Sequence, residues 1–150
     1  MITTGIEVFT IGFTKKTAPR FFENLREAGV RRIVDVRLNN TSHLAGFSKK
    51  GDLEYFLAQI LRAEYIHLPI LAPTQAMLDA YKKNGGDWAA YERDFLALMQ
   101  TREIEKHVSR EILDRGCLLC SEEKPHHCHR RLVAEYLSHK WEGVEIRHLG

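Results

Sequence analysis

The sequence predicts a single-domain α/β protein whose mainly parallel β-sheet carries helices on both faces. The chain has 150 residues, a length that suits one domain with one continuous core. Its hydrophobic content of 44% lies well above the range of disordered chains. Short apolar runs of strand-forming residues alternate with helical patterns, and strands separated by helices pair in parallel through right-handed crossovers. Residues 1–150 are therefore expected to form one doubly wound domain.

The first half of the chain alternates between strand and helix. Val8–Ile11 has the composition of a first strand, and a helix capped by Thr17 and ended by Gly29 follows it. Ile33–Val36 is expected to form the second strand. After a polar segment, apolar residues recur at helical spacing, and these are Leu53, Phe56, Leu57, Ile60 and Leu61. Tyr65–Leu68 is the expected third strand.

The second half continues the alternation. A short helix is expected over Thr74–Lys83, and a longer helical pattern, capped by Asp87, runs from Trp88 to Arg115. Cys117–Cys120 is predicted to form a short buried strand. A helix from about His129 to His139 leads to a last strand, Val144–His148, which we expect at the edge of the sheet. No internal repeat or linker interrupts the pattern.

The predicted strand ends carry reactive, charged or tight-turn residues. They are Gly12 after the first strand, Asp35 and Arg37 at the second, His67 at the third and Cys120 at the fourth. Parallel α/β sheets place functional groups in the crevice at the carboxyl ends of their strands. We therefore expect all four ends to lie on one rim and to form a composite site.

The lack of an apolar span or secretory signal, together with the cysteine content, indicates a cytoplasmic protein. The formal net charge of +2 does not by itself require a nucleic-acid partner. No run approaches the roughly 20 apolar residues of a membrane span, and the first residues lack the pattern of a secretory signal. The 3 cysteines are an odd number, which argues against a disulfide framework. The sequence does not indicate an oligomeric state.

The same strand ends belong to motifs that occur together in a known family. The motifs are Thr10-Ile11-Gly12, Asp35-Val36-Arg37, Ser42 with Gly46-Phe47-Ser48-Lys49, His67-Leu68-Pro69, and Cys120-x-Glu122-x-x-Pro125-x-x-Cys128-His129-Arg130. In this order they resemble the domain-of-unknown-function 488 family, over Thr10 to Leu137. The resemblance implies an α/β domain with a cysteine-bearing site. It links some relatives with DNA-repair or nucleic-acid systems, without a settled reaction.

Cys128 is the candidate nucleophile. It lies at the start of the last main helix, where the helix dipole and the neighbouring His129 and Arg130 favour a thiolate. The alternative is that Cys128 packs under the helix start. Cys120 ends a strand and could meet Cys128 as a redox or mixed-ligand pair. Cys117 should point to the opposite face of the sheet and pack in the core.

Zinc is a possible cofactor, although no residue is assigned as a ligand. The donors that would suit it are Cys120, His126, His127, Cys128 and His129. No second pair of ligands appears elsewhere in the chain, except that His67 could approach this group. The sequence therefore favours a site without metal.

Asp35 and Arg37 are two residues apart on a strand and should point to one face. Arg37 could hold an anion while Asp35 orients it or acts as a base, or the two could form a structural ion pair. His67 is a candidate general acid or base. Gly12 would let the first turn pass close to a ligand.

A basic lip is expected around this rim. Its members are Lys49, Lys50, Arg130 and Arg131, with Phe47 available to stack on a base. The lip would contact nucleic acid or another anion. The alternative is an ordinary solvated positive surface.

Three function classes follow. The first is a cysteine enzyme that acts on an anionic, nucleic-acid-related substrate or on an anionic small molecule. The second is a nucleic-acid-binding accessory module, and the third is a redox- or metal-responsive protein. The catalytic candidates are Cys128, Arg37, Asp35 and His67, and the substrate-binding candidates are Gly12, Lys49, Arg130 and Cys120. A phosphatase-type Cys-x5-Arg loop is excluded, because His126 and Ala134 stand where that arginine would be.

Overall fold

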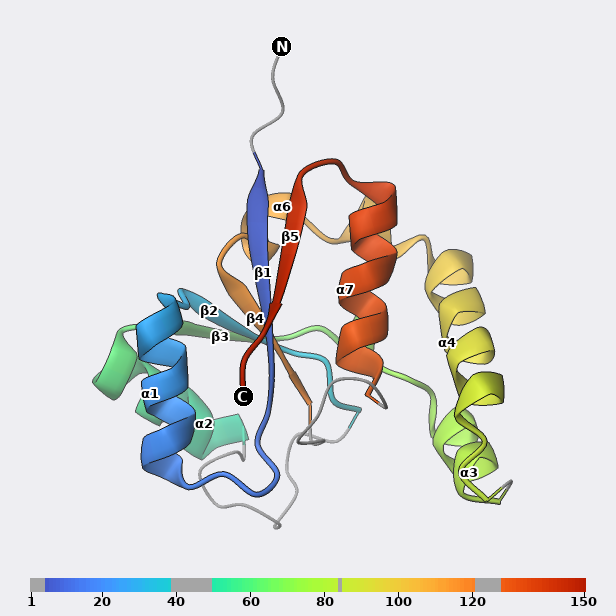
Figure 1. Ribbon diagram of the computed structural model, residues 1–150, viewed down its shortest axis with the longest axis horizontal. Helices are drawn as coiled ribbons and strands as arrows, with labels where there is room; N and C mark the ends of the chain where they lie inside the picture. Colours follow the sequence, from blue (N-terminus) through green and yellow to red (C-terminus); the bar gives the residue numbers. More distant parts are fainter. Residues whose placement is uncertain (1–4, 39–49, 84, 121–127) are drawn as a thin grey trace.

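A computed structural model describes residues 5–38, 50–83, 85–120 and 128–150, and in this part of the chain a five-stranded sheet forms the centre (Figure 1). The strands lie in the order β3-β2-β4-β1-β5, and each neighbouring pair is parallel. Their bounds are β1 Ile6–Gly12, β2 Arg32–Asp35, β3 Glu64–His67, β4 Gly116–Cys120 and β5 Val144–His148. The predicted α/β class and the edge position of the last strand are confirmed.

Helices cover both faces of the sheet, as predicted. The helical segments are α1 Ala18–Ala28, α2 Lys50–Phe56, η2 Leu57–Leu61, η3 Pro69–Leu71, α3 Gln75–Lys83, α4 Trp88–Arg102, α5 Ile104–His107, α6 Arg110–Leu113 and α7 His129–Lys140. Helices α1 and α2 pack on one face, and α3, α4 and α7 lie on the other (Figure 1). No helix in the described residues is long and apolar enough to cross a membrane.

Alternation along β4 divides the core into two halves. Cys117 and Leu119 pack with α1 and α2, whereas Leu118 and Cys120 pack with α4 and α7. Successive side chains of a strand point to opposite faces, so a strand buried on both sides contributes to both halves. The prediction that Cys117 and Cys120 face opposite ways is therefore confirmed.

The predicted helix caps are present. The Thr17 hydroxyl accepts a hydrogen bond from the Arg20 amide at 3.3 Å, and Gly29 ends α1 in the left-handed conformation at φ 74°. Asp87 starts α4 by accepting from the Ala90 amide at 3.2 Å. These local signals explain why both helix starts follow from the sequence.

The expectation of one helical pattern from Trp88 to Arg115 is wrong. Helix α4 ends where Glu103 turns left-handed at φ 49°, and Ser109 caps a new short helix. A straight helix of this length would span about 40 Å, which is longer than the strands beneath it. The two breaks let Ile104 and Leu113 both reach the core, where each is fully buried.

The apolar pattern at 53–61 forms a helix whose last turn differs from expectation. Leu53 and Leu57 are fully buried, but Ile60 is 40% exposed. Leu57–Leu61 winds as a π-helix, which changes the spacing of its side chains around the axis. The regular i, i+3, i+4 stripe therefore does not continue into this turn.

Gly116→Ala is expected to lower the free energy of unfolding by about 1–3 kcal/mol. An added Cβ would lie 3.0 Å from the Ile112 carbonyl oxygen, 3.1 Å from that of Leu113 and 3.3 Å from a methyl carbon of Val34. Backbone atoms cannot yield as a flexible side chain can. Urea unfolding monitored by circular dichroism measures the change.

Gly51→Ala is the matched control. A Cβ at this position meets no atom of the described residues within 4 Å, and Gly51 lies in α2, where alanine favours helix. This variant should be as stable as the wild type or slightly more so. Equal stability of the two variants would contradict the close packing of β4 against α6.

Candidate functional site

The carboxyl ends of the strands converge, as predicted. In the parallel registers Gly12 pairs with Cys120, and Asp35 pairs with both Leu119 and His67. Arg37 follows directly after β2, so it lies at this same edge. The architectural expectation of a shared rim is therefore confirmed.

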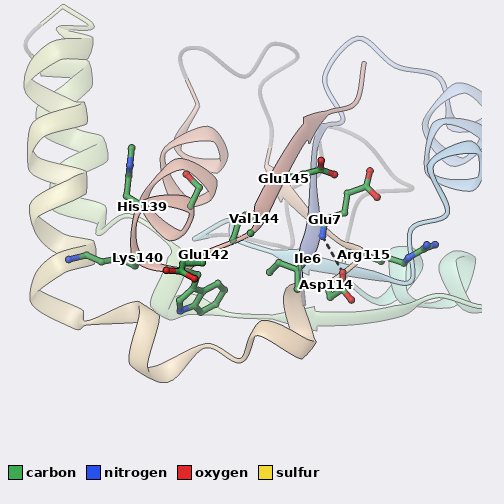
Figure 2. Close-up of a pocket in the computed structure, with 13 residues that line it drawn as sticks. Ile6, Glu7, Asp114, Arg115, His139, Lys140, Glu142, Val144 and Glu145 are labelled. Carbon is green, nitrogen blue, oxygen red and sulfur yellow. Dashed lines mark hydrogen bonds between the residues drawn. The ribbon is translucent and has the colours of Figure 1, made fainter. Parts of the chain in front are cut away.

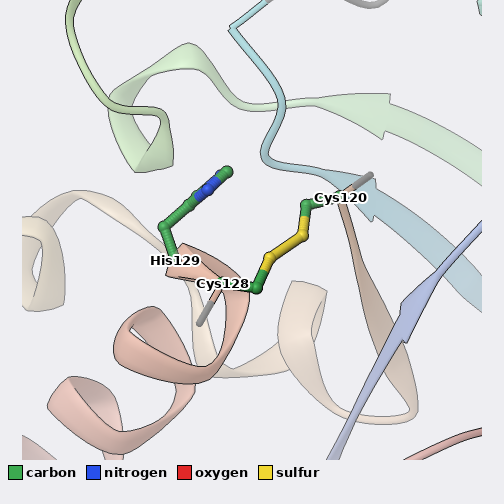
Figure 3. Close-up of side chains that lie close together, drawn as sticks. All are labelled: Cys120, Cys128 and His129. Carbon is green, nitrogen blue, oxygen red and sulfur yellow. A yellow bond between two sulfur atoms is a disulfide. The ribbon is translucent and has the colours of Figure 1, made fainter. Parts of the chain in front are cut away.

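Two of the three cysteines are joined at this rim. Cys120 ends β4, Cys128 immediately precedes α7, and a disulfide links them (Figure 3). Their exposed fractions are 1% and 3%, respectively. Of the alternatives that the sequence left open for these two cysteines, the structure has the bonded pair, although the odd cysteine count argued against a disulfide framework. The odd count requires only that one cysteine stay free, and that one is Cys117.

Cys117 has the core role expected of it. The side chain is fully buried beneath α1 and α2, on the far side of the sheet from the disulfide. Burial raises the pKa of the Cys117 thiol well above its ordinary value, although the positive charge of Arg130 lowers it in part. The thiol is therefore protonated and unreactive at neutral pH.

Arg130 lies inside the protein rather than on a basic lip. Its side chain is fully buried, and it donates through Nη1 to Cys120 Sγ at 3.4 Å. Its Nε donates to the Thr10 hydroxyl at 3.3 Å, and that hydroxyl contacts His148 Nδ1 at 2.6 Å. Helix periodicity places Arg130 in the first turn of α7 facing the sheet, where it contacts the cysteine pair.

The predicted basic lip is not formed as expected. Besides the buried Arg130, Arg131 pairs with the carboxylates of Glu135 at 3.2 Å and Glu92 at 3.7 Å. Lys50 is exposed at the start of α2, whereas Lys49 and Phe47 lie outside the described residues. Two of the four cations are thus engaged within the fold.

Asp35 and Arg37 form a buried ion pair. Arg37 donates from Nε to Asp35 Oδ1 at 2.9 Å and from Nη2 to Oδ2 at 2.8 Å. The Tyr65 hydroxyl donates to Asp35 Oδ2 at 2.5 Å, and the Arg37 guanidinium lies 5.4 Å from the centre of the Phe13 ring. Asp35 is fully buried and Arg37 is 4% exposed. Of the two interpretations left open by the sequence, this geometry favours the structural ion pair.

Two histidines hold the backbone next to this pair. His67 Nε2 lies 2.7 Å from the Arg37 carbonyl oxygen, and His129 Nε2 lies 2.7 Å from that of Val36. A carbonyl only accepts, so each Nε2 carries the proton when the ring is neutral. His67 thus has a positioning role at the end of β2, in addition to its candidate role as an acid or base.

His129 is neutral, contrary to the expectation that it adds positive charge beside Cys128. Burial lowers the pKa of His129 to about 4, and the charge of Arg130 lowers it as well, against the Val36 hydrogen bond and the Asp35 charge. The ring also packs 5.5 Å from the Phe95 ring. Among the described residues, the positive charge beside the cysteines therefore comes from Arg130.

The stability of the protein is expected to decrease as the pH falls from about 6.5 to about 4, partly because of His129. The unfolded chain takes up a proton near the ordinary histidine pKa, whereas the folded chain takes one up only near the pKa of about 4. Acid therefore favours the unfolded state by up to about 3 kcal/mol through this one group. Urea unfolding at several pH values measures the loss.

His129→Gln should reduce the loss of stability between about pH 6.5 and about pH 4, because the glutamine amide can donate to the Val36 carbonyl without titrating. His107→Gln, at an exposed position, should leave this loss unchanged. An NMR titration in which the His129 ring protonates near pH 6.5 would contradict the assignment.

The described donors give incomplete support for a metal site. Cys120, Cys128 and His129 place their donor atoms within 4.8 Å of one another. Zinc takes thiolates and usually four ligands, whereas these two sulfurs are bonded to each other. His126 and His127 lie outside the described residues. The donor set thus suits zinc only after reduction and with further ligands.

A cavity of about 1060 Å³ opens at the opposite, amino edge of the sheet (Figure 2). Its lining mixes acidic and basic side chains, including Glu7, Asp114, Arg115, Lys140 and Glu145. None of the candidate site residues that the structure describes lines it. The rim with the cysteine pair and this cavity are therefore separate features.

Sequence reasoning missed three residues that contact the site. Thr10 and His148 are paired in the β1–β5 register, and Tyr65 lies on β3, where it pairs with Ile33 of β2 and reaches Asp35 with its hydroxyl. One signal was usable, because Thr10 is the single polar residue of the apolar run Val8–Ile11. His148 and Tyr65 could be found only from the register.

Fold and site together define a single-domain, parallel α/β protein with a cysteine pair at the carboxyl edge of its sheet. The family model described as "Domain of unknown function DUF488" matches residues 17–137, and the chain belongs to this family. The matched segment includes both Cys120 and Cys128 but begins after Thr10-Ile11-Gly12. No curated protein and no solved structure matches the chain.

Proposed function

We propose that the protein is a thiol–disulfide redox protein in which Cys120 and Cys128 alternate between two thiols and one disulfide. The observation that carries this proposal is the bonded pair itself, at the sheet edge where α/β proteins gather functional groups. A buried guanidinium next to Cys120 adds support, since positive charge favours the thiolate needed for exchange. In the cytoplasmic location expected from the sequence, a disulfide is usually catalytic or redox-sensing.

The chemistry is a two-electron exchange with a small thiol or a protein dithiol. Two molecules of thiol reduce the disulfide, yielding the two cysteine thiols and one external disulfide. The reverse reaction reoxidises the pair. Either direction conserves atoms and electrons without a further cofactor.

The other function classes have weaker support from the described residues. A cysteine enzyme with an anionic substrate would use Cys128 in its reduced form and Arg37 as the anion site. However, Arg37 is held by Asp35, and Arg130 is held at Cys120. The same engagement of cations weakens the case for a nucleic-acid-binding module. Zinc held by the reduced cysteines is the competing account of the pair.

The test is a redox titration of the purified protein. Samples are equilibrated at a series of ratios of reduced to oxidised glutathione, quenched in acid and alkylated. The mass of the intact protein is then measured by mass spectrometry. We expect two cysteines to change state together in one reversible transition. The Cys120→Ser/Cys128→Ser variant should show no such transition, while Cys117 stays reduced in both proteins.

Two results would contradict the redox proposal. One is a wild type in which all three thiols remain free at every glutathione ratio. The other is stoichiometric zinc that protects both cysteines from oxidation, which would favour the metal account.

A further inference from the structure

The two sulfurs of the disulfide have unequal surroundings. Cys120 Sγ accepts a hydrogen bond from the Arg130 guanidinium at 3.4 Å, inside the protein. Cys128 occupies the position before α7, yet its side chain does not cap the helix. A hydrogen bond from a charged donor is about twice as strong as a neutral one, and it is strongest when the acceptor is an anion.

This difference bears on the direction of exchange. When a thiolate attacks one sulfur of a disulfide, the other sulfur leaves with the bonding electron pair. The better stabilised leaving thiolate departs faster. In the described part of the chain, Arg130 donates to Cys120 Sγ, so the departure of Cys120 places the new negative charge against Arg130.

Building on the proposed redox function, we propose that the external thiol attacks Cys128, and that Arg130 stabilises Cys120 as the leaving thiolate. The entering sulfur forms a mixed disulfide with Cys128 as the Cys120–Cys128 bond breaks. A second thiol then attacks the entering sulfur, which leaves with its new partner as a disulfide. Cys128 keeps the electron pair and takes up a proton. The substrate class is therefore a thiol, or a disulfide in the reverse direction.

Thr10 is a positioning residue in this arrangement. Its hydroxyl accepts from Arg130 Nε, so its own proton is directed to His148 Nδ1 at 2.6 Å. Thr10 is fully buried in β1, and its register partner on β5 is His148 itself. The pairing of β1 with β5 thus holds the Thr10 hydroxyl in place. That hydroxyl in turn holds the Arg130 guanidinium next to Cys120 Sγ.

The first measurement maps the mixed disulfide. Oxidised protein is mixed briefly with limiting glutathione, quenched in acid and digested, and the glutathione adduct is located by mass spectrometry. We expect the adduct on Cys128. An adduct found on Cys120, or equally on both, would overturn the assignment. A disulfide that does not react with glutathione at all would instead contradict the proposed function.

The second measurement tests Arg130 and Thr10 by the equilibrium constant for oxidation with glutathione disulfide. Arg130→Met should raise this constant by about tenfold or more, because the reduced form loses its stabilised thiolate. Arg130→Lys, which keeps the charge, should change it less. Thr10→Val should raise it by about threefold, and Thr10→Ser should restore the wild-type value.

These variants separate positioning from folding. If Arg130→Met fails to fold, Thr10→Val and Thr10→Ser still test the same contact, since valine matches the shape of threonine and serine retains the hydroxyl. An equilibrium constant of Arg130→Met equal to that of the wild type, or of Thr10→Val equal to it where Arg130→Met does not fold, would overturn the role of Arg130.

Discussion

Asp35→Ala is expected to lower the free energy of unfolding by about 3–5 kcal/mol. Asp35 accepts three hydrogen bonds from Arg37, one of them from its backbone amide at 3.0 Å, and another from Tyr65. Removal of the carboxylate leaves the Arg37 guanidinium, only 4% exposed, without this counter-charge. Urea unfolding at neutral pH gives the change directly.

An exposed ion pair provides the control. Arg32 and Glu64 also lie 2.8 Å apart, but the Glu64 side chain is 70% exposed. Glu64→Ala should therefore cost less than about 1 kcal/mol. Asp35→Leu combined with Arg37→Met should recover much of the stability lost in Asp35→Ala, because neither charge of this pair then remains buried. A loss in Asp35→Ala no greater than that in Glu64→Ala would contradict the buried ion pair.

Phe95→Ala is also expected to cost about 3–5 kcal/mol. Phe95 is fully buried on α4, where its ring packs 6.1 Å from the Tyr91 ring and 5.5 Å from the His129 ring. The substitution removes apolar contacts and opens a cavity between α4 and α7. Thermal and urea unfolding measure the stability.

The same variant should affect His129. With less burial the main cause of its lowered pKa weakens, so the His129 ring should titrate above a pKa of about 4. Phe95→Leu, which keeps most of the volume, should cost less and shift the titration less. An unchanged His129 titration in Phe95→Ala would show that burial by this ring does not set the histidine's charge state.

The shared rim could be predicted because it depends on patterns that are local in the sequence. Apolar runs ended by Gly12, Asp35, His67 and Cys120 mark strand ends, and parallel topology brings such ends together. The opposite orientations of Cys117 and Cys120 followed from the period of a strand alone.

The predictions that were wrong concern features that depend on tertiary contacts. An arginine in the first turn of a helix is usually solvated, and only the packing of α7 against β1 and β4 shows that Arg130 is buried. His129 is neutral because the folded chain buries its ring, which lowers its pKa. Glu103 ends α4 without a glycine or proline to mark the break.

The sequence allows the pairing of Cys120 with Cys128 but does not require it. Their separation of 8 residues permits a bond, a shared metal or no contact at all. The conformation of the chain around them decides among these, and spacing alone does not determine it. The structure places Cys128 at the start of α7, beside the end of β4.

Peptide mapping of mildly oxidised protein, after alkylation of free thiols in denaturant so that the buried Cys117 also reacts, tests the central claim most directly. Trypsin leaves residues 116–130 as one peptide with all three cysteines, because Lys124 precedes proline. A glutamate-specific protease, which cuts after Glu122 or Glu123, separates Cys128 from the other two. We predict that its two fragments stay linked through Cys120 and Cys128, with the alkyl label on Cys117 alone, and that a reductant separates them. Fragments that separate without reductant, with label on all three cysteines, would contradict the account.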